Sequence, residues 1–207
     1  MAPEGWPFIA VFALLSVGVA VLARPWMAVF PILLMLFMLF FFRDPDRTVP
    51  GGPGVFVSPA DGEVIIVKEV HEDEYLNSDT VMISIFMSPL NVHVNRAPME
   101  GVVEEVVHTS GRFIAAFKEH ASMVNEHIDM VMNGPQGRIL VRQVAGFLAR
   151  RAVCRVKPGD SLKRGERYGV IKFGSRLDVY LPLGTEIPVR VDQTVRAGET
   201  VLGKVSG

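Results

Sequence analysis

A stretch near the C-terminus decides the fold of this chain: Ile171-Lys172-Phe173-Gly174-Ser175-Arg176-Leu177-Asp178-Val179-Tyr180-Leu181-Pro182. Its β-branched and aromatic residues predict a strand, but Gly174 and Ser175 interrupt the pattern. Glycine inside a strand usually marks a bulge or a close approach of another backbone. The Ser175 hydroxyl is also within covalent reach of the Gly174 carbonyl, which no side chain shields. The pair is therefore either a simple bulge or a site of chemistry.

The N-terminal part of the chain is strongly apolar. Overall, 49% of the 207 residues are hydrophobic and the mean hydropathy is +0.32, which is high for a soluble protein. Most of this excess lies in two runs, residues 6–23 and 26–42, separated by Arg24-Pro25. Each run is near the lower length limit for a membrane-spanning helix, about 17 to 25 residues. Two short spans and a re-entrant hairpin therefore both remain open.

We predict that residues 1–47 form a helical hairpin embedded in the cell membrane. A turn at Arg24-Pro25 would return the chain to the side on which it began. Arg43 and Arg47 favour the cytoplasmic side for the folded domain that follows. A Pro- and Gly-rich linker, residues 48–54, then opens a second domain that extends over residues 48–207.

The second domain has the pattern of a mainly β protein, an antiparallel sandwich or barrel. Its short β-branched runs are bounded by Gly or Pro, and one modest helix is predicted around residues 113–123. The predicted strands cover Val55–Val57, Gly62–Val67, Val81–Phe86, Gly101–Val107, Ile139–Val141 and Ala152–Val156.

A weak internal repeat refines this architecture. Residues 162–166 and 195–199 share an apolar-basic-x-Gly-Glu pattern, and residues 97–103 add a looser third element. These segments resemble the turns of lipoyl- and biotinyl-type barrel-sandwich domains. Carriers of that type present a lysine between methionines at a hairpin tip, and the sequence has no such tripeptide. The repeat therefore predicts barrel-sandwich hybrid elements without the carrier function.

Charge is distributed unevenly along the chain. Residues 1–137 contain seven Lys or Arg and sixteen Asp or Glu, whereas residues 138–207 contain fourteen and six. The asymmetry indicates either a surface oriented towards anionic lipid or pairing between the two halves of one fold. Nothing in the sequence resembles a nucleic-acid-binding module.

Three motifs combine an unusual backbone with a functional side chain. They are Ser58-Pro59-Ala60-Asp61-Gly62, the segment from Met87 to Pro98 with His93 at its centre, and Phe173-Gly174-Ser175. Asp, His and Ser are the components of an activated serine. Each motif also has a structural explanation, as a turn, a buried histidine or a bulge, and their spacing does not show that they meet.

Taken in order, the motifs resemble the short form of the phosphatidylserine decarboxylase proenzymes. The resemblance rests on Pro-Ala-Asp-Gly, on Ser-Pro-x-x-x-His ending in Pro, and on Gly-Ser in a strand ending in Pro. It covers nearly the whole chain, and Asn125-Glu126-His127 is similar to a further segment of that family.

The resemblance implies that the chain makes its own cofactor. Ser175 would attack the Gly174 carbonyl, and elimination from the resulting ester would leave a pyruvoyl group at residue 175. The chain would then consist of two fragments, residues 1–174 and 175–207. The pyruvoyl ketone would take the substrate amine and accept the electrons released as carbon dioxide leaves. The implied partners are a membrane phospholipid and the two fragments themselves, and we predict no metal.

The resemblance also suggests roles for the polar residues around Ser175. His93 is the candidate proton donor, because the unperturbed pKa of a histidine side chain lies near working pH. Asp61 would orient or charge-stabilise a base during cleavage. The longer enzymes of the family have a second histidine, held to be the cleavage base, where this chain has Arg96. Either His93 serves both steps, or cleavage depends on backbone strain and Asp61.

Three arginines are candidates for substrate binding. Arg176 is close enough to hold a carboxylate or phosphate of the substrate, since guanidinium suits bidentate contacts, but a solvated strand position explains it equally well. Arg150 and Arg151 are candidates for the phosphodiester, with a solvated or interface role as the alternative.

Two other functions compete with the decarboxylase. A membrane-anchored barrel-sandwich adaptor would explain the N-terminus and the repeat, but would leave Asp61, His93 and Ser175 as coincidences. A membrane-bound serine hydrolase would use the same three residues without cleaving itself, although its usual Gly-x-Ser-x-Gly motif is absent. The sequence does not distinguish phosphatidylserine from an archaeal analogue, and exposed strand edges are compatible with a homodimer.

Overall fold

A computed structural model describes residues 1–112, 124–146, 152–172 and 175–205. Contacts within the chain divide it into two compact units, Met1–Asp46 and Arg47–Gly207. The helix predicted around residues 113–123 lies outside the described residues.

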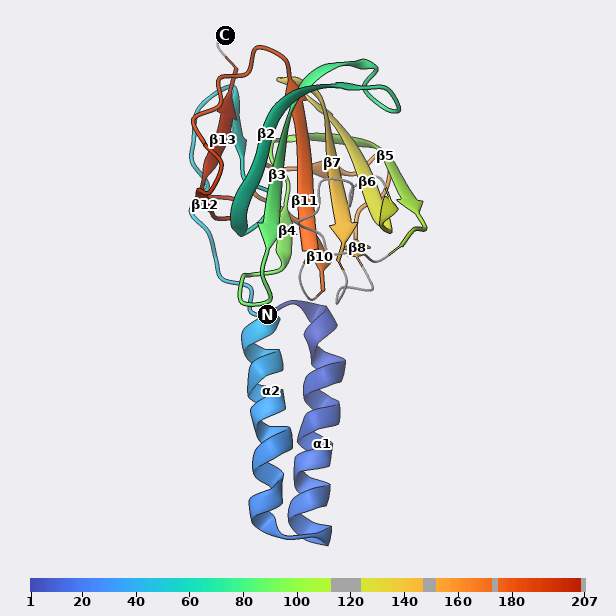
Figure 1. Ribbon diagram of the computed structural model, residues 1–207, viewed down its shortest axis with the longest axis vertical. Helices are drawn as coiled ribbons and strands as arrows, with labels where there is room; N and C mark the ends of the chain where they lie inside the picture. The colour runs from blue at the N-terminus through green and yellow to red at the C-terminus, as the bar shows by residue number, and fades with distance from the viewer. Residues whose placement is uncertain (113–123, 147–151, 173–174, 206–207) are drawn as a thin grey trace. The chain divides into compact units, whose positions relative to one another are not determined.

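The N-terminal unit is a pair of apolar helices, as predicted (Figure 1). It consists of η1 (Pro3–Gly5), α1 (Trp6–Leu22), η2 (Pro25–Ala28) and α2 (Val29–Phe41). Large apolar side chains on both helices are exposed, which suits a lipid environment better than water. The helical segment Pro3–Leu22 is long and apolar enough to cross a membrane, whereas Pro25–Phe41 is shorter.

The open end of this hairpin is closed by specific contacts. The Ala2 backbone N–H donates to the Phe42 carbonyl at 2.8 Å, and the Phe8 and Phe42 rings stack with their centroids 5.6 Å apart. The Arg43 guanidinium donates to the Phe40 carbonyl at 2.8 Å, and the Arg43 backbone N–H donates to the same carbonyl at 3.3 Å, near the end of α2. The two helix ends are therefore held together within the unit itself.

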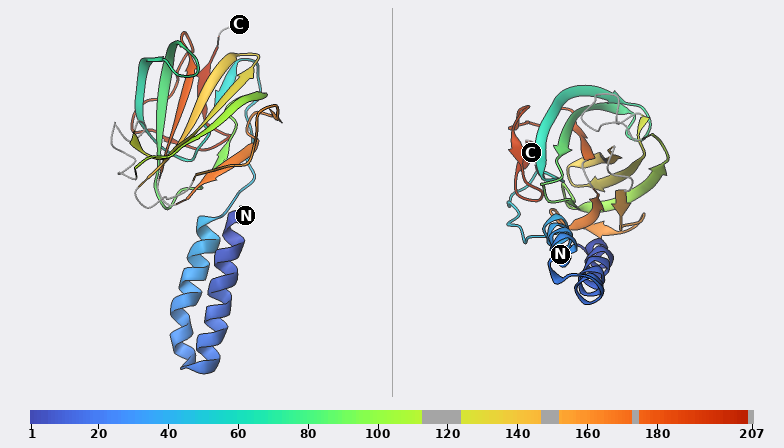
Figure 2. Two further views of the ribbon diagram at one scale, coloured as in Figure 1. Left: turned by 90° about the vertical axis from the view of Figure 1, so that its right-hand side faces the viewer. Right: turned by 60° about the horizontal axis from the view of Figure 1, so that its bottom comes forward.

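The C-terminal unit is built around an antiparallel eight-stranded sheet with the order β12-β2-β3-β11-β7-β6-β5-β9. Figure 1 shows β11 inside this sheet between β3 and β7, and Figure 2 shows the curl of the sheet. Its strands are β2 (Gly62–Glu72), β3 (Ser78–Met87), β5 (Gly101–Thr109), β6 (His127–Gly134), β7 (Gly137–Ala145), β9 (Ser161–Leu162), β11 (Ser175–Pro182) and β12 (Thr194–Val195).

Two smaller sheets complete the unit. One has the order β4-β10-β8, and the other pairs β1 with β13. Their strands are β1 (Val55–Val57), β4 (Val94–Arg96), β8 (Ala152–Cys154), β10 (Arg167–Ile171) and β13 (Val201–Lys204). The predicted mainly β, antiparallel fold behind an apolar helix pair is thus confirmed.

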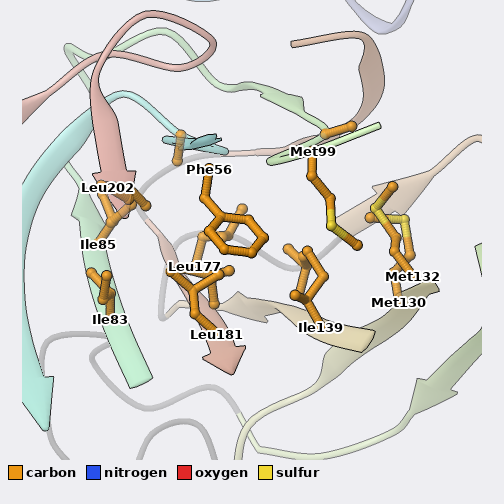
Figure 3. Packing of buried hydrophobic residues seen from close by; sticks show 14 of the residues in the cluster. Phe56, Ile83, Ile85, Met99, Met130, Met132, Ile139, Leu177, Leu181 and Leu202 are labelled. Carbon is orange, nitrogen blue, oxygen red and sulfur yellow. The ribbon is translucent and has the colours of Figure 1, made fainter. Parts of the chain in front are cut away.

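The hydrophobic core is assembled from all three sheets. Figure 3 shows Phe56 of β1 among Leu177 and Leu181 of β11, with Leu202 of β13 beside Ile85 of β3. On β11 the inward side chains alternate with outward ones, as the pleat of a strand requires. The side chain of Ser175 therefore faces the same side as the core residues that follow it at alternate positions.

The two copies of the internal repeat form matching turns. Gly165 and Gly198 have φ values of 77° and 76°, a region that favours glycine. In each turn the glutamate backbone N–H donates to the carbonyl three residues earlier, at 3.0 and 3.1 Å. The two turns pack together, since a Cβ on Gly198 would lie 3.7 Å from the Gly165 Cα.

The prediction of one continuous strand over residues 171–182 is wrong. β10 ends at Ile171 in the three-stranded sheet, and β11 begins at Ser175 in the eight-stranded sheet. The hydrophobic pattern continues because both strands contribute to the same core. Ser175 therefore begins a strand in a different sheet from the one in which β10 ends.

Candidate active site

Ser175 is the first residue of β11 and is completely buried. It pairs with Met87 at the end of β3 and with Ala145 at the end of β7. Ala145 is itself held by Asn125, whose side-chain amide donates to the Ala145 carbonyl at 2.7 Å. The backbone at Ser175 is thus fixed from both neighbouring strands.

His93 lies at the same junction between sheets. It is buried and directly precedes β4, and its carbonyl accepts a hydrogen bond from the Ile171 backbone N–H at 3.2 Å. Ile171 is the last residue of β10, four positions before Ser175. The His93 backbone is therefore hydrogen-bonded to the residue four positions before Ser175.

A connected set of buried side chains from the large sheet and from β4 of the three-stranded sheet reaches Ser175. The Ser175 hydroxyl donates to the Met87 sulfur at 3.5 Å, and the Asn95 side-chain amide donates to the same sulfur at 3.9 Å. Gln143 of β7 donates to the Asn95 side-chain oxygen at 2.8 Å. The sequence interpretation missed all three neighbours, although the His93-x-Asn95 spacing puts two polar residues on one face of an extended segment.

Asp61 is held in a separate ion pair. Its carboxylate accepts two hydrogen bonds from Arg47, at 2.8 and 3.0 Å, and one from the Ala197 backbone N–H at 2.8 Å. Glu63, two residues later, is in register with Phe86, which is in register with Arg176. Asp61 therefore lies at the same end of the sheet as Ser175, but its carboxylate binds the chain that enters the domain.

Arg96, at the position for which the resemblance suggested a histidine in the longer enzymes, is buried at the end of β4. Its backbone N–H donates to the Pro59 carbonyl at 2.9 Å, and its guanidinium donates to the Gly165 carbonyl at 2.9 Å. Its Cδ is also 3.0 Å from the position of a Cβ on Gly198. Arg96 thus fills the space between the two repeat turns and the turn that presents Asp61.

Arg176 faces away from Ser175, on the other side of β11. Its guanidinium is completely buried and donates to Asp178 at 2.6 Å and to the Ser84 hydroxyl at 2.8 Å. The solvated position considered from the sequence is therefore wrong, because the alternate face of β11 is covered as well. A contact between Arg176 and the substrate stays a prediction.

The same outer face carries a second charged group. Arg142 of β7 donates to both oxygens of Asp129 on β6, at 2.6 and 3.0 Å, and His127 is 3.4 Å from Asp129. The hydrogen bond to Asp129 raises the pKa of His127, against the opposing effect of burial. Burial raises the pKa of Asp129, but hydrogen bonds from His127 and Arg142 outweigh it and leave this pKa below its ordinary value.

Three predicted site residues lie outside the described residues, namely Gly174, Arg150 and Arg151. Their assignments stay predictions from the sequence.

The chain was compared with known proteins. The family model described as phosphatidylserine decarboxylase matches residues 34–203. A phosphatidylserine decarboxylase proenzyme of Carboxydothermus hydrogenoformans is 46% identical, over all of this chain and 97% of the relative. Proenzymes of the same description from Citrifermentans bemidjiense and Desulfotalea psychrophila are 49% and 41% identical, over 98% and 99% of this chain and 95% and 96% of the relatives.

The chain belongs to the phosphatidylserine decarboxylase family. The resemblance inferred from three short motifs is thereby confirmed along nearly the entire sequence. The relatives of the phosphatidylserine decarboxylase family cited above are all described as proenzymes, that is, as precursors. The comparisons give no support to a non-catalytic adaptor or to a serine hydrolase.

Proposed function

We propose that this chain is a self-processing, pyruvoyl-dependent decarboxylase that converts phosphatidylserine to phosphatidylethanolamine. The observation that carries the proposal is the position of Ser175. Ser175 follows a glycine in the sequence, is buried, and begins β11 shortly after β10 ends in a different sheet. The His93 carbonyl accepts a hydrogen bond from Ile171, the last residue of β10. A structural serine has no evident reason to occupy such a junction.

The cleavage chemistry needs the chain's own atoms and one water molecule. The Ser175 Oγ adds to the Gly174 carbonyl carbon, the Gly174–Ser175 C–N bond breaks, and the hydroxyl proton ends on the Ser175 nitrogen. The resulting ester is then opened by loss of the Ser175 α-proton, with the Gly174 carboxylate leaving together with Oγ. Hydrolysis of the dehydroalanine releases ammonia and leaves the pyruvoyl group on a fragment of residues 175–207.

The surroundings of residue 175 fit such a group. Ser175 is completely buried, and apart from core side chains its surroundings include the Asn95 amide, which donates to the same Met87 sulfur as the Ser175 hydroxyl. When present, the pyruvoyl ketone supplies the electron sink for decarboxylation. His93 would deliver a proton from its imidazole to the carbon that has lost carbon dioxide.

Asp61 and the arginines have supporting roles in this proposal. The ion pair with Arg47 supports a role of Asp61 in fixing the entry of the chain into the domain and in setting the charge at this end of the sheet. Arg150 and Arg151 remain the candidates for the phosphate of the lipid. For Arg176 the buried pair with Asp178 supports a structural role more directly than a contact with substrate.

The helical hairpin would keep the enzyme at its lipid substrate. We propose that the hairpin, residues 1–47, is embedded in the cell membrane and that the β domain, residues 48–207, lies on the cytoplasmic side. The apolar α1 supports the membrane location, and Arg43 and Arg47 at the end of the hairpin support the side.

Intact-mass analysis of the purified protein tests the proposal directly. We expect two fragments that meet between Gly174 and Ser175, with a small fragment whose N-terminus resists amine-reactive reagents. The preparation should release carbon dioxide from vesicles that contain phosphatidylserine. A single full-length chain in a preparation that decarboxylates the lipid would refute self-processing, and a processed chain with no release would refute the activity.

A further inference from the structure

We propose that Asn95 supplies the side-chain hydrogen bond that stabilises the oxyanion of self-cleavage, and that Gln143 is the positioning residue that orients the Asn95 amide. The inference rests on the proposed processing at Ser175 and adds a donor to it. Asn95 lies within the Met87–Pro98 motif but was given no role from the sequence, and Gln143 lies outside all three motifs.

The first observation is that Ser175 and Asn95 share one partner. Both donate to the Met87 sulfur, at 3.5 and 3.9 Å, so the Asn95 amide and the Ser175 hydroxyl contact one common atom. A thioether is a weak acceptor. The Asn95 N–H is therefore poorly satisfied in the precursor and keeps most of its hydrogen-bonding capacity for a stronger acceptor that forms nearby.

The second observation is that the Asn95 amide has a fixed direction. Gln143 donates to the Asn95 oxygen at 2.8 Å, and this bond turns the Asn95 N–H towards Met87 and Ser175. The bond crosses from β7 in the large sheet to β4 in the small one, and both side chains are buried. A buried amide oriented in this way needs no rearrangement when charge develops.

The third observation is that accommodating the Asn95 and Gln143 side chains lowers the stability of the fold. A Cβ on Gly169 would lie 2.9 Å from the Gln143 amide nitrogen, so β10 can approach Gln143 this closely only because residue 169 is glycine. The Gln143 oxygen is buried and has no hydrogen-bond partner among the described residues. An unsatisfied buried polar group costs about 1–3 kcal/mol, so the pair is hard to explain by stability alone.

These contacts match the charge that the cleavage step creates. When the Ser175 Oγ adds to the Gly174 carbonyl, the carbonyl π electrons move to the Gly174 oxygen. A hydrogen bond from Asn95 to that oxygen would replace one to neutral sulfur, and bonds to charged acceptors are roughly twice as strong as neutral ones. The donor thus stabilises the transition state more than the ground state, which is what accelerates a reaction.

Cleavage rates of matched precursors test the assignment. Wild type, Asn95→Leu, Gln143→Glu and Thr80→Val would be made by pulse-labelled cell-free synthesis with lipid vesicles, and their conversion to fragments followed on gels. Thr80→Val is the control, because it removes a part-buried side-chain hydrogen bond of 3.1 Å at the far end of β3. Neutral hydroxylamine, which cleaves esters but not amides, would report formation of the ester in each precursor.

We expect Asn95→Leu to slow cleavage by about a hundredfold, the usual effect of losing one oxyanion donor. It should also lower the hydroxylamine-sensitive fraction of the folded precursor by a similar factor, whereas a purely structural loss would leave that fraction of the folded precursor unchanged. Gln143→Glu should slow cleavage about tenfold or more, since a carboxylate cannot donate to the Asn95 oxygen. Thr80→Val should cleave at the wild-type rate.

The outcomes separate this inference from the proposed function. The Asn95→Leu precursor is informative if it melts within a few degrees of the wild type. If it then cleaves at the same rate as the wild type, Asn95 is not the donor. Unchanged cleavage in Gln143→Glu would show that Asn95 donates to position 143 and not towards Ser175, which also overturns the assignment. Failure of the wild type to cleave would instead overturn the proposed function itself.

Discussion

The two faces of β11 are both buried, but they are built from different chemistry. On the inner face Ser175 is followed by Leu177, Val179 and Leu181, and its polar neighbours are uncharged amides and a thioether. On the outer face Arg176 and Asp178 form an ion pair that continues the charged row of β6 and β7. The side chains of successive residues of β11 thus lie in chemically different surroundings, one uncharged and one charged.

The outer face extends across four strands. Ser84, Asp178, Arg142 and Asp129 are in register across β3, β11, β7 and β6. The tip of the β2–β3 hairpin contributes Tyr75 and Leu76 to an apolar cluster on the neighbouring row. This face holds the strands in place by paired charges, whereas the contacts of Ser175 and Asn95 on the inner face are with the uncharged Met87 and Gln143.

A change at Ser175 is the strongest test of the difference between the two faces of β11. We expect Ser175→Ala to abolish both cleavage and decarboxylation, because no other atom at this position can attack the Gly174 carbonyl. Its thermal midpoint should stay within a few degrees of the wild-type precursor, since the hydroxyl makes only a weak bond to sulfur. Gel analysis and thermal unfolding measure the two effects. A processed Ser175→Ala protein would remove Ser175 as the nucleophile.

On the outer face the expected effect is on stability. In the uncleaved Ser175→Ala background, Arg176→Met should lower the free energy of unfolding by about 3–5 kcal/mol, because Asp178 is left buried without its partner. For a domain of this size that is roughly 10 °C in the midpoint. The double change Arg176→Met with Asp178→Leu should recover much of the loss, since it removes the unpaired charge.

Kinetics on the same position separate structure from substrate binding. With Ser175 restored, folded and processed Arg176→Met protein should keep the wild-type KM for phosphatidylserine vesicles. A rise of tenfold or more in KM, with kcat unchanged, would show that Arg176 contacts the lipid and would break the division between the two faces.

The sequence was sufficient to predict the β-rich domain, the helix pair and the three motifs, because each has a recognisable local pattern of residues. β6 was missed although Ile128, Met130 and Met132 alternate along it, since Asp129 and Asn133 weaken the hydrophobic signal. The crossing between β10 and β11 has no local signal, because both strands line the same core.

The amides of the site could not be predicted from the sequence for a related reason. Asn95 and Gln143 are 48 positions apart and uncharged, and only pairing between two sheets brings them together. The partner of Asp61 was equally hidden, since Arg47 was assigned to the membrane segment and not to the domain. Long-range polar contacts of this kind depend on topology, which the hydrophobic pattern does not specify.

The smallest expected effect concerns His127 at the edge of the charged row. The hydrogen bond to Asp129 raises the pKa of His127 in the folded state, so protonated His127 stabilises the fold. This contribution is complete below the unfolded pKa of about 6.5 and is lost as the pH rises through the folded pKa. The lowered pKa of Asp129 acts in the other direction, because its contribution is present above about pH 3.9 and is lost as the pH falls through its folded pKa.

Both groups are therefore charged and paired between these limits, and the effect of removing His127 should depend on pH. We expect the midpoint difference between the Ser175→Ala background and the same background with His127→Gln to be larger at about pH 5.5 than at about pH 9, by a few degrees. Cleavage rates of the precursor with and without His127→Gln should agree at each pH, because His127 faces away from Ser175. A midpoint difference that is constant with pH would show that the His127–Asp129 contact is not a charged pair, and a matching change in cleavage would show that the two faces of the sheet are coupled.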